Sequence, residues 1–253
     1  MKKLVSIFML FALALVSTTV WAESLGERIR ASKNNVTKEV RVGRFDAVCL
    51  NGSSEIVYTQ TSGKQKLELS VPDNLQDIVQ VYVKDHTLFL ELKKGYSVSF
   101  ENGTRLELRV AAPMVKNVVV NGSGDIIFKN GVDVNDAINW TVNGSGDIDA
   151  DKVKCRKMNV AVNGSGDVTL SGKCTKANYS LSGSVDITGS ALKAKQVTAY
   201  TSPRSTGDIS CYASEKIIIN KEGKNSDVSY SGNPRTVEKN STKGKRHRRS
   251  NDD

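Results

Sequence analysis

Residues 121–125 read Asn121-Gly122-Ser123-Gly124-Asp125, and the same five residue types return at 143–147 and at 163–167. Shortened copies of this motif keep its acid at Asp186, Asp208 and Asp227. From Asp125 onward, the six acids are 22, 20, 19, 22 and 19 residues apart. One such pentapeptide would indicate only a turn, whereas three identical copies at nearly constant spacing predict a repeat architecture.

The residues on both sides of each turn alternate between apolar and polar types. The position after the acid is always β-branched and apolar: Ile126, Ile148, Val168, Ile187, Ile209 and Val228. The position after that is mostly polar, as at Asp149 and Thr169. Alternation with a period of two is typical of strands with one buried face. Residues 114–234 also contain 14 Val and 9 Ile against 3 Leu, which favours strands over helices.

A repeat of about 20 residues is too short to close a core alone, so neighbouring copies must stack on one another. Equivalent strands then pair in parallel, about 4.8 Å apart. Crossovers between parallel strands are overwhelmingly right-handed. The sequence therefore predicts an all-β fold, a right-handed parallel β-helix whose regular coils span residues 114–234.

The rest of the chain divides around this array. Residues 43–113 are rich in predicted strands but less regular, and we expect them to form an irregular N-terminal cap and first coils of the same domain, 43–234. Residues 23–42 are polar and predict a loose segment. Residues 235–253 predict a basic, disordered tail.

The N-terminus has the pattern of a secretory signal peptide over residues 1–22. Lys2 and Lys3 precede an apolar run from Leu4 to Val16, and Ala22 provides a small residue for cleavage. No later apolar run is long enough to span a membrane. We therefore expect an exported protein located in the periplasm, at the cell surface or in the medium.

The formal net charge of the 253 residues is +9, but much of it lies in the tail. The run Lys243-Gly244-Lys245-Arg246-His247-Arg248-Arg249 could contact anionic surfaces, with a merely solvated tail as the alternative. No aromatic side chain interrupts this run. Because an exported protein also rarely meets nucleic acid, we expect no nucleic-acid partner. We also expect no cofactor.

The repeated Asn and Gly residues predict a structural turn. Asn121, Asn143 and Asn163 would stack as an internal amide ladder, with Ser182 interrupting it. The glycines of the motif would supply the positive φ of a tight corner, and they are Gly122, Gly124, Gly144, Gly146, Gly164 and Gly166.

Carboxylates stacked about 4.8 Å apart repel one another, so the acid column needs compensation. The first interpretation is local, with each Asp accepting hydrogen bonds from the amides of its own turn. The second is a calcium site made of hard oxygen ligands, with the candidates Asp125, Asp147, Asp149, Asp151 and Asp167.

Cys155 and Cys174 occupy equivalent places in successive repeats, eight and seven residues after their acids. They are therefore predicted neighbours, joined by a disulfide or buried as free thiols. None of the four cysteines has a Cys-x-x-Cys spacing, which gives no support to a zinc site.

Several motifs outside the repeat add to this pattern. They are Phe45 with Asn51-Gly52-Ser53-Ser54-Glu55-Ile56, then Val71-Pro72-Asp73, Asp85-His86-Thr87-Leu88 and Ala112-Pro113. With the repeated turns, they resemble the putative auto-transporter adhesin, head GIN domain family over roughly residues 43–231. The resemblance implies an exported right-handed β-helix of the bacterial envelope, common in Bacteroidetes, with no assigned activity.

We expect this chain to act as a non-catalytic, adhesion-like surface module. Its expected partner is an envelope or host polymer, such as a glycan, or an envelope protein. The alternatives are a carbohydrate-cleaving enzyme and a purely structural envelope component. Stacked carboxylates fall near the separation of about 5 Å found in retaining glycosidases, but His86 is the only histidine before the tail.

Overall fold

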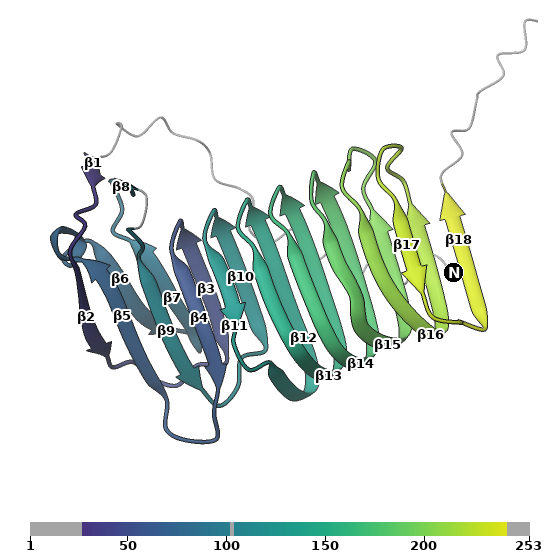
Figure 1. Ribbon diagram of the computed structural model, residues 1–253, viewed down its shortest axis with the longest axis horizontal. Coiled ribbons are helices and arrows are strands. Elements are labelled where there is room, and N and C mark those ends of the chain that lie inside the picture. The colour runs from purple at the N-terminus through teal and green to yellow at the C-terminus, as the bar shows by residue number, and fades with distance from the viewer. Residues whose placement is uncertain (1–26, 102–103, 242–253) are drawn as a thin grey trace, which may run out of the picture.

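The computed structural model describes residues 27–101 and 104–241 (Figure 1). It is 68% strand and 1% helix, which confirms the all-β fold. The predicted signal peptide and the basic run 243–249 lie outside the described residues. No helix in the described part of the chain is both long and apolar enough to cross a membrane.

The strands of the N-terminal half are short. They are β1 (Glu27–Arg30), β2 (Asn35–Val40), β3 (Ala47–Gly52), β4 (Glu55–Gln60), β5 (Lys66–Pro72), β6 (Val79–Lys84), β7 (Thr87–Leu92), β8 (Tyr96–Ser99) and β9 (Glu107–Ala112). A single 3-10 turn, η1 (Asp73–Leu75), follows β5. The later strands are β10 (Asn117–Gly122), β11 (Asp125–Phe128), β12 (Val132–Gly144), β13 (Ile148–Gly164), β14 (Val168–Gly183), β15 (Ile187–Thr201), β16 (Ile209–Lys221), β17 (Val228–Ser231) and β18 (Thr236–Ser241).

Successive coils stack in parallel with equivalent residues opposite one another. β10 pairs with β3 on one side and with β12 on the other, so Asn51, Asn121 and Asn143 share one column. β13, β14, β15 and β16 continue the stack side by side, giving about six coils in total (Figure 1). This arrangement is the predicted parallel β-helix, with the turn motif as its repeating corner.

The inward side chains form columns of β-branched residues along the axis of the solenoid. Ile126, Ile148, Val168, Ile187 and Ile209 follow one such column and are at most 1% exposed. Branched aliphatic side chains suit this role because the same shape can repeat every coil at a fixed spacing.

Three aromatic side chains fill the core where the irregular and regular parts meet. The rings of Phe128 and Trp140 stack with their centroids 4.5 Å apart, and Tyr58 meets Phe128 edge-on at 5.2 Å. The hydroxyl of Tyr58 donates to the carbonyl of Ala112 at 2.9 Å, so this large side chain is buried without an unpaired polar group.

The N-terminal region is more regular than we expected, and its coils are not in chain order. β3 and β4 form a full coil in register with β10 and β11, with Glu55 opposite Asp125. On the other side of this coil, β7 pairs in parallel with β3 and β9 pairs in parallel with β4. Antiparallel pairing of β6 with β7 and of β5 with β9 then ends the parallel stack.

Two segments predicted to be loose contain strands. β2 pairs antiparallel with β5, and β1 pairs in parallel with β8, so residues 27–30 and 35–40 are part of the cap. At the other end, β18 pairs in parallel with β16, so the predicted tail does not begin at residue 235. Their side chains are mostly exposed, and such edge strands lack the apolar alternation by which strands are predicted from sequence.

Candidate ligand-binding surface

An asparagine ladder runs along the turns. The Nδ2 atoms of Asn121, Asn143 and Asn163 each donate to the Oδ1 atom of the preceding Asn, at 2.9, 3.0 and 3.0 Å. We expected the ladder inside the solenoid, but it lies on the outer surface. The alternation that buries Val120 and Val142 turns the next residue of each strand outward.

The ladder has a defined start and a defined interruption. At its start, Asn51 donates to Oε2 of Glu91 at 2.6 Å, and the hydroxyl of Tyr82 donates to Oε1 of the same carboxylate at 2.7 Å. A carboxylate only accepts hydrogen bonds, which makes it a suitable end for a chain of amide donors. Ser182 stands opposite Asn163 and replaces the amide there.

A second asparagine ladder was missed by the sequence analysis. Asn139, Asn159 and Asn178 donate in turn to the preceding Asn of their column, beginning at Asn117, over 2.9, 2.7 and 2.7 Å. The signal was available, because these residues are 22, 20 and 19 positions apart, the same spacing as the first acids of the turn column.

Both glycines of each turn lie against the backbone of the preceding coil, and the first also needs a positive φ. Gly144 and Gly164 have φ values of 138° and 152°, which confirms the expected positive φ for the first glycine of the motif. The second glycine, Gly124, Gly146 or Gly166, has no such φ. It is needed because a Cβ atom on Gly166 would lie 2.0 Å from the carbonyl oxygen of Gly146 in the preceding coil.

The carboxylates of the acid column bond between coils and not within their own turns. Oδ1 of Asp125 accepts from the backbone N–H of Asp147 at 3.0 Å, and Oδ1 of Asp147 accepts from that of Asp167 at 2.7 Å. In the same way, the backbone N–H groups of Asp186, Asp208 and Asp227 each donate to Oδ1 of the preceding acid. Each carboxylate from Asp125 to Asp208 thus takes the place of a backbone acceptor in the parallel ladder, which offsets its repulsion from its neighbours.

The five calcium candidates do not converge. Asp125, Asp147 and Asp167 lie one per coil along the corner, whereas Asp149 and Asp151 lie further along β13. Asp151 accepts a hydrogen bond from the hydroxyl of Ser171 at 2.7 Å. Within residues 27–101 and 104–241, no group of three or more His, Cys, Asp or Glu side chains could hold a metal ion.

Substitutions at Asp147 test whether the column is a hydrogen-bonded support. We expect Asp147→Ala to lower the melting temperature by about 3 °C, because the amide of Asp167 loses its acceptor. Asp147→Asn keeps an oxygen at the same place and should match the wild type within about 1 °C. Differential scanning calorimetry measures both.

The same calorimetry also tests the calcium interpretation. Millimolar calcium chloride should leave all three melting temperatures unchanged, since backbone amides already satisfy the carboxylates. A large rise with calcium in the wild type that is absent from Asp147→Asn would contradict the hydrogen-bonded column and restore the metal site.

Cys155 and Cys174 lie opposite each other on β13 and β14, as predicted, and both are free, buried thiols. Their hydrogen bond and burial raise the pKa of the Cys174 thiol, and burial raises the pKa of Cys211 to about 12. The same hydrogen bond lowers the pKa of the Cys155 thiol. A thiol that stays protonated is a poor nucleophile, which applies to Cys174 and Cys211.

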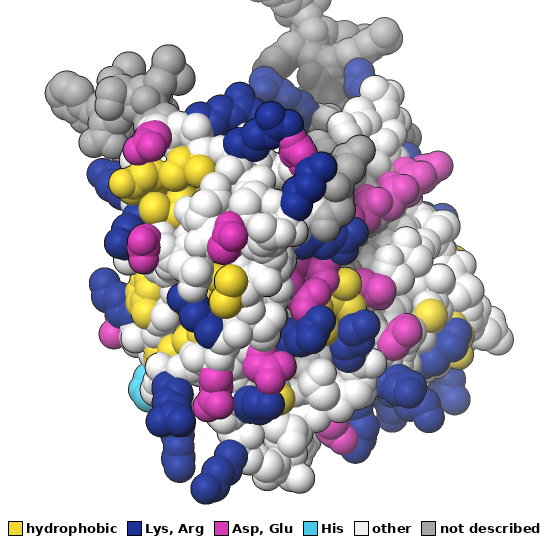
Figure 2. Space-filling view, turned by 60° about the vertical axis from the view of Figure 1, so that its left-hand side comes forward, with side chains coloured by type: hydrophobic (Ala, Val, Ile, Leu, Met, Phe, Trp, Pro, Cys, Tyr) yellow, Lys and Arg dark blue, Asp and Glu magenta, His cyan; other side chains and the backbone are white. Residues whose placement is uncertain are grey.

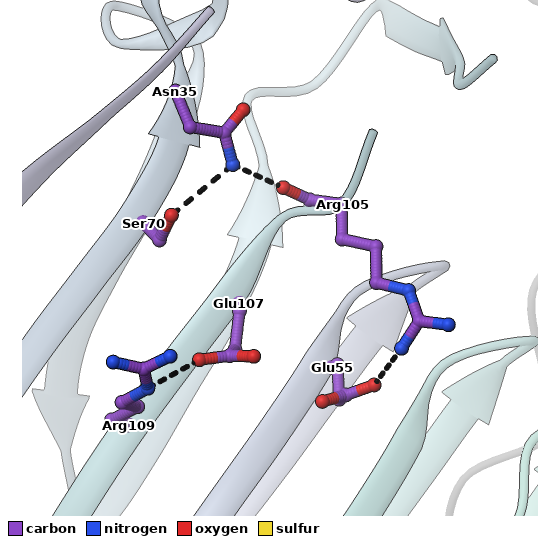
Figure 3. Close-up of polar contacts among 6 residues, drawn as sticks. All are labelled: Asn35, Glu55, Ser70, Arg105, Glu107 and Arg109. Atoms are coloured by element: carbon purple, nitrogen blue, oxygen red, sulfur yellow. Dashed lines mark hydrogen bonds and ion pairs between the residues drawn. The ribbon is translucent and has the colours of Figure 1, made fainter. Parts of the chain in front are cut away.

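Four charged side chains at the border of the cap form two ion pairs (Figure 3). Arg105 contacts Oε2 of Glu55 at 3.0 Å, and Arg109 pairs with Glu107. The side-chain amide of Asn35 donates to Ser70 and to the carbonyl of Arg105, at 3.1 and 2.8 Å. These contacts join β2, β4, β5 and β9 and compensate the local charges.

Two hollows lie beside this network in the described surface, and both are shallow. One, of about 110 Å³, lies over β4, β5 and β9 between Val57 and Arg109. The other, of about 210 Å³, lies between Glu55, Arg105 and Asp125. Pockets for small molecules usually enclose about 300–1,000 Å³, so a broad surface is the better candidate for binding.

Comparison with known proteins gives one family and several structures. Residues 44–234 match the family model described as putative auto-transporter adhesin, head GIN domain. A putative adhesin from Bacteroides fragilis NCTC 9343 is 31% identical, with a TM-score of 0.77, and the match covers 84% of this chain and 95% of that one. No curated protein matches the chain.

Two more distant structures share the fold. A putative lipid binding protein from Parabacteroides distasonis ATCC 8503 is 20% identical, with a TM-score of 0.65, over 84% of this chain and 97% of that one. A putative adhesin from Parabacteroides merdae ATCC 43184 is 19% identical, with a TM-score of 0.62, over 85% and 97%.

Proposed function

This chain belongs to the putative auto-transporter adhesin, head GIN domain family, and from that premise we propose that it is an exported, non-catalytic module that binds an extended partner across its coils. The partner is an envelope or host polymer, such as a glycan, or another envelope protein. The proposed location is the periplasm, the cell surface or the medium.

One observation carries this proposal: the outer surface of the coils is a set of repeating polar columns. On the strand after each turn, the register places Asp149, Thr169, Thr188, Ser210 and Ser229 opposite one another. A row of hydroxyl groups repeating about every 4.8 Å can make many similar weak contacts with a partner that is itself extended and repetitive.

The stacked carboxylates give less support to a carbohydrate-cleaving enzyme. A glycosidase needs one carboxyl group that protonates the leaving group and a second that acts as a nucleophile or base, in different environments. In the acid column, Asp125, Asp147 and Asp167 have nearly identical surroundings, since each accepts one backbone N–H from the next coil. This uniformity favours support of the turn.

A binding and turnover screen tests the proposed function. We expect the full-length chain to bind a subset of envelope and host glycans weakly, without releasing any shorter sugar. Binding should fall as sodium chloride is raised if the basic tail contributes, and deletion of residues 242–253 should weaken it about threefold. This deletion spares β18, whereas removing residues from 235 onward would also remove a paired strand.

Glycan arrays and reducing-end assays provide the two measurements. Sugar release that disappears in Asp147→Asn would contradict the non-catalytic assignment. Binding by the chain without residues 242–253 that equals the wild type at every salt concentration would remove the role given to the tail.

A further inference from the structure

Lysine side chains form two neighbouring columns within the long strands β13, β14 and β15, between one turn motif and the next. Lys154, Lys173 and Lys193 stand opposite one another on β13, β14 and β15, and Lys157 stands opposite Lys176. We refer to these five residues as the lysine edge. Figure 2 shows acidic side chains toward the upper right of the molecule and basic ones toward the lower right.

Acidic side chains compensate the basic columns at both ends. On the N-terminal side, Lys154 pairs with Asp133 at 2.8 Å and Arg156 with Asp136 at 3.2 Å. On the C-terminal side, the pairs are Lys195 with Glu215 at 3.4 Å and Lys216 with Glu238 at 2.7 Å. The same face of the coils therefore accommodates a carboxylate beside an ammonium group wherever the sequence supplies one.

The middle of the lysine edge has no such compensation. The side chains of Lys157, Lys173 and Lys176 make no ion pair or hydrogen bond with any residue of the described chain. Lys193 contacts only the carbonyl of Ser190, at 3.3 Å, and the ring of Tyr212, at 4.0 Å. Ammonium groups on coils about 4.8 Å apart repel one another, so an anionic partner would lower their energy.

The shape of the edge restricts that partner. Its charges repeat along the solenoid axis, one or two per coil, which matches a linear chain with an anionic group on each unit. The exposed large apolar residues of the described surface, Val36, Tyr96, Tyr230 and Val237, all lie outside the edge. A membrane-binding surface normally adds such residues to its basic ones, so a polymer fits better than a lipid surface.

We propose that the lysine edge binds a linear anionic polysaccharide lying along the solenoid axis across β13, β14 and β15. This rests on the proposed function and adds the chemical class and the position of the ligand. The carboxylates or sulfates of the polymer take the places that Asp133 and Glu238 occupy at the two ends of the basic columns.

The test compares two triple variants with the same change in net charge. Lys157→Gln, Lys173→Gln and Lys176→Gln remove the uncompensated centre, whereas Lys38→Gln, Lys64→Gln and Lys84→Gln remove three exposed lysines of the cap. The probe is polygalacturonate, and its methyl ester is the neutral control with the same backbone. Calorimetric titration of the full-length chain measures binding.

We expect polygalacturonate to bind the wild type, with a dissociation constant about tenfold higher for the edge variant and within about twofold for the cap variant. The methyl ester should not bind detectably. Since all six lysines lie on the surface, both variants should melt within about 2 °C of the wild type.

Five results would overturn the proposal, and the last two also separate it from the proposed function. An equal loss of affinity for polygalacturonate in both variants would show a general charge effect. Binding of the methyl ester would show that the anionic groups are not needed for recognition. Absent polygalacturonate binding together with edge-dependent binding to vesicles of anionic phospholipid would assign the edge to membranes. If glycans of the screen described above bind the edge variant as tightly as the wild type, the proposed function stands but the lysine edge is not the site. If no polymer binds the wild type, both the proposed function and this inference fail.

Discussion

Ile148→Asp and Val168→Asp are each expected to unfold the domain at room temperature or bring it close to unfolding, whereas Thr169→Asp should leave it folded. Ile148 and Val168 are 1% and 0% exposed and belong to the column of β-branched residues that runs through the coils. A carboxyl group placed there has no partner in the described core, and such burial costs more than about 4 kcal/mol. Urea denaturation followed by far-ultraviolet circular dichroism measures the loss.

Thr169→Asp is the matched control because Thr169 is adjacent to Val168 and points outward. It stands opposite Asp149, so we expect a small loss of about 0.5 kcal/mol from repulsion between two exposed carboxylates. Equal losses for the three variants would show that the assignment of inward and outward faces is wrong.

Gly166→Ala is expected to lower the free energy of unfolding by about 3 kcal/mol and the melting temperature by about 10 °C. The added methyl group would lie 2.0 Å from the carbonyl oxygen of Gly146 and 2.7 Å from its carbonyl carbon. Both atoms belong to the backbone, so no side chain can rotate away and the two coils must separate locally. Thermal unfolding monitored by circular dichroism measures this loss.

Gly43→Ala is the control for Gly166→Ala, because a Cβ atom at Gly43 has nothing within 4 Å and its φ is not positive. We expect no loss there, or a gain of a few tenths of a kcal/mol from reduced freedom of the unfolded chain. If Gly166→Ala were as mild as Gly43→Ala, the close approach of successive turns would be contradicted.

The sequence was sufficient to predict the architecture because the fold repeats. Asn121, Asn143 and Asn163 recur at nearly constant spacing, and a repeat that cannot close a core alone has few ways to fold. The alternation of apolar and polar residues also predicted which side chains point inward, because the alternation repeats with each coil. Ile126, Ile148 and Val168 are similar in type and stand in one column.

Contacts between coils were harder to predict, since periodicity gives the position of a residue and not its partner. The carboxylate of Asp147 was expected to bond within its turn, but it accepts the amide of Asp167 one coil away. Gly166 was assigned a special φ, but it is needed because Gly146 lies against it. Both errors arise from interpreting a turn alone when its closest neighbour is another turn.

The sequence analysis missed the lysine edge because it considered only the net charge of the chain. Once the signal peptide and the tail are set aside, the body of the chain has a formal charge of only about +3, which indicates no basic surface. Acidic and basic side chains that cancel in the net charge lie apart in the structure. The acids of the turns lie on one side of the coils, whereas Lys154, Lys173 and Lys193 lie on another segment. Net charge therefore underestimates the local potential when a regular fold sorts its charges by column.

The inverted order of the first coils has a consequence for how the chain folds. The coil of β3 and β4 lies between β7 with β9 on one side and β10 with β11 on the other. One of its edges therefore stays open until the chain reaches residue 112, and the other until residue 128. We therefore expect this coil to form first, as the starting point of the array. Every later coil can then form on the coil before it, through contacts between residues about 20 positions apart in sequence. We expect the array to grow toward β18, so that removing the last coil shortens it whereas removing β7 or β9 leaves the first coil with an open edge.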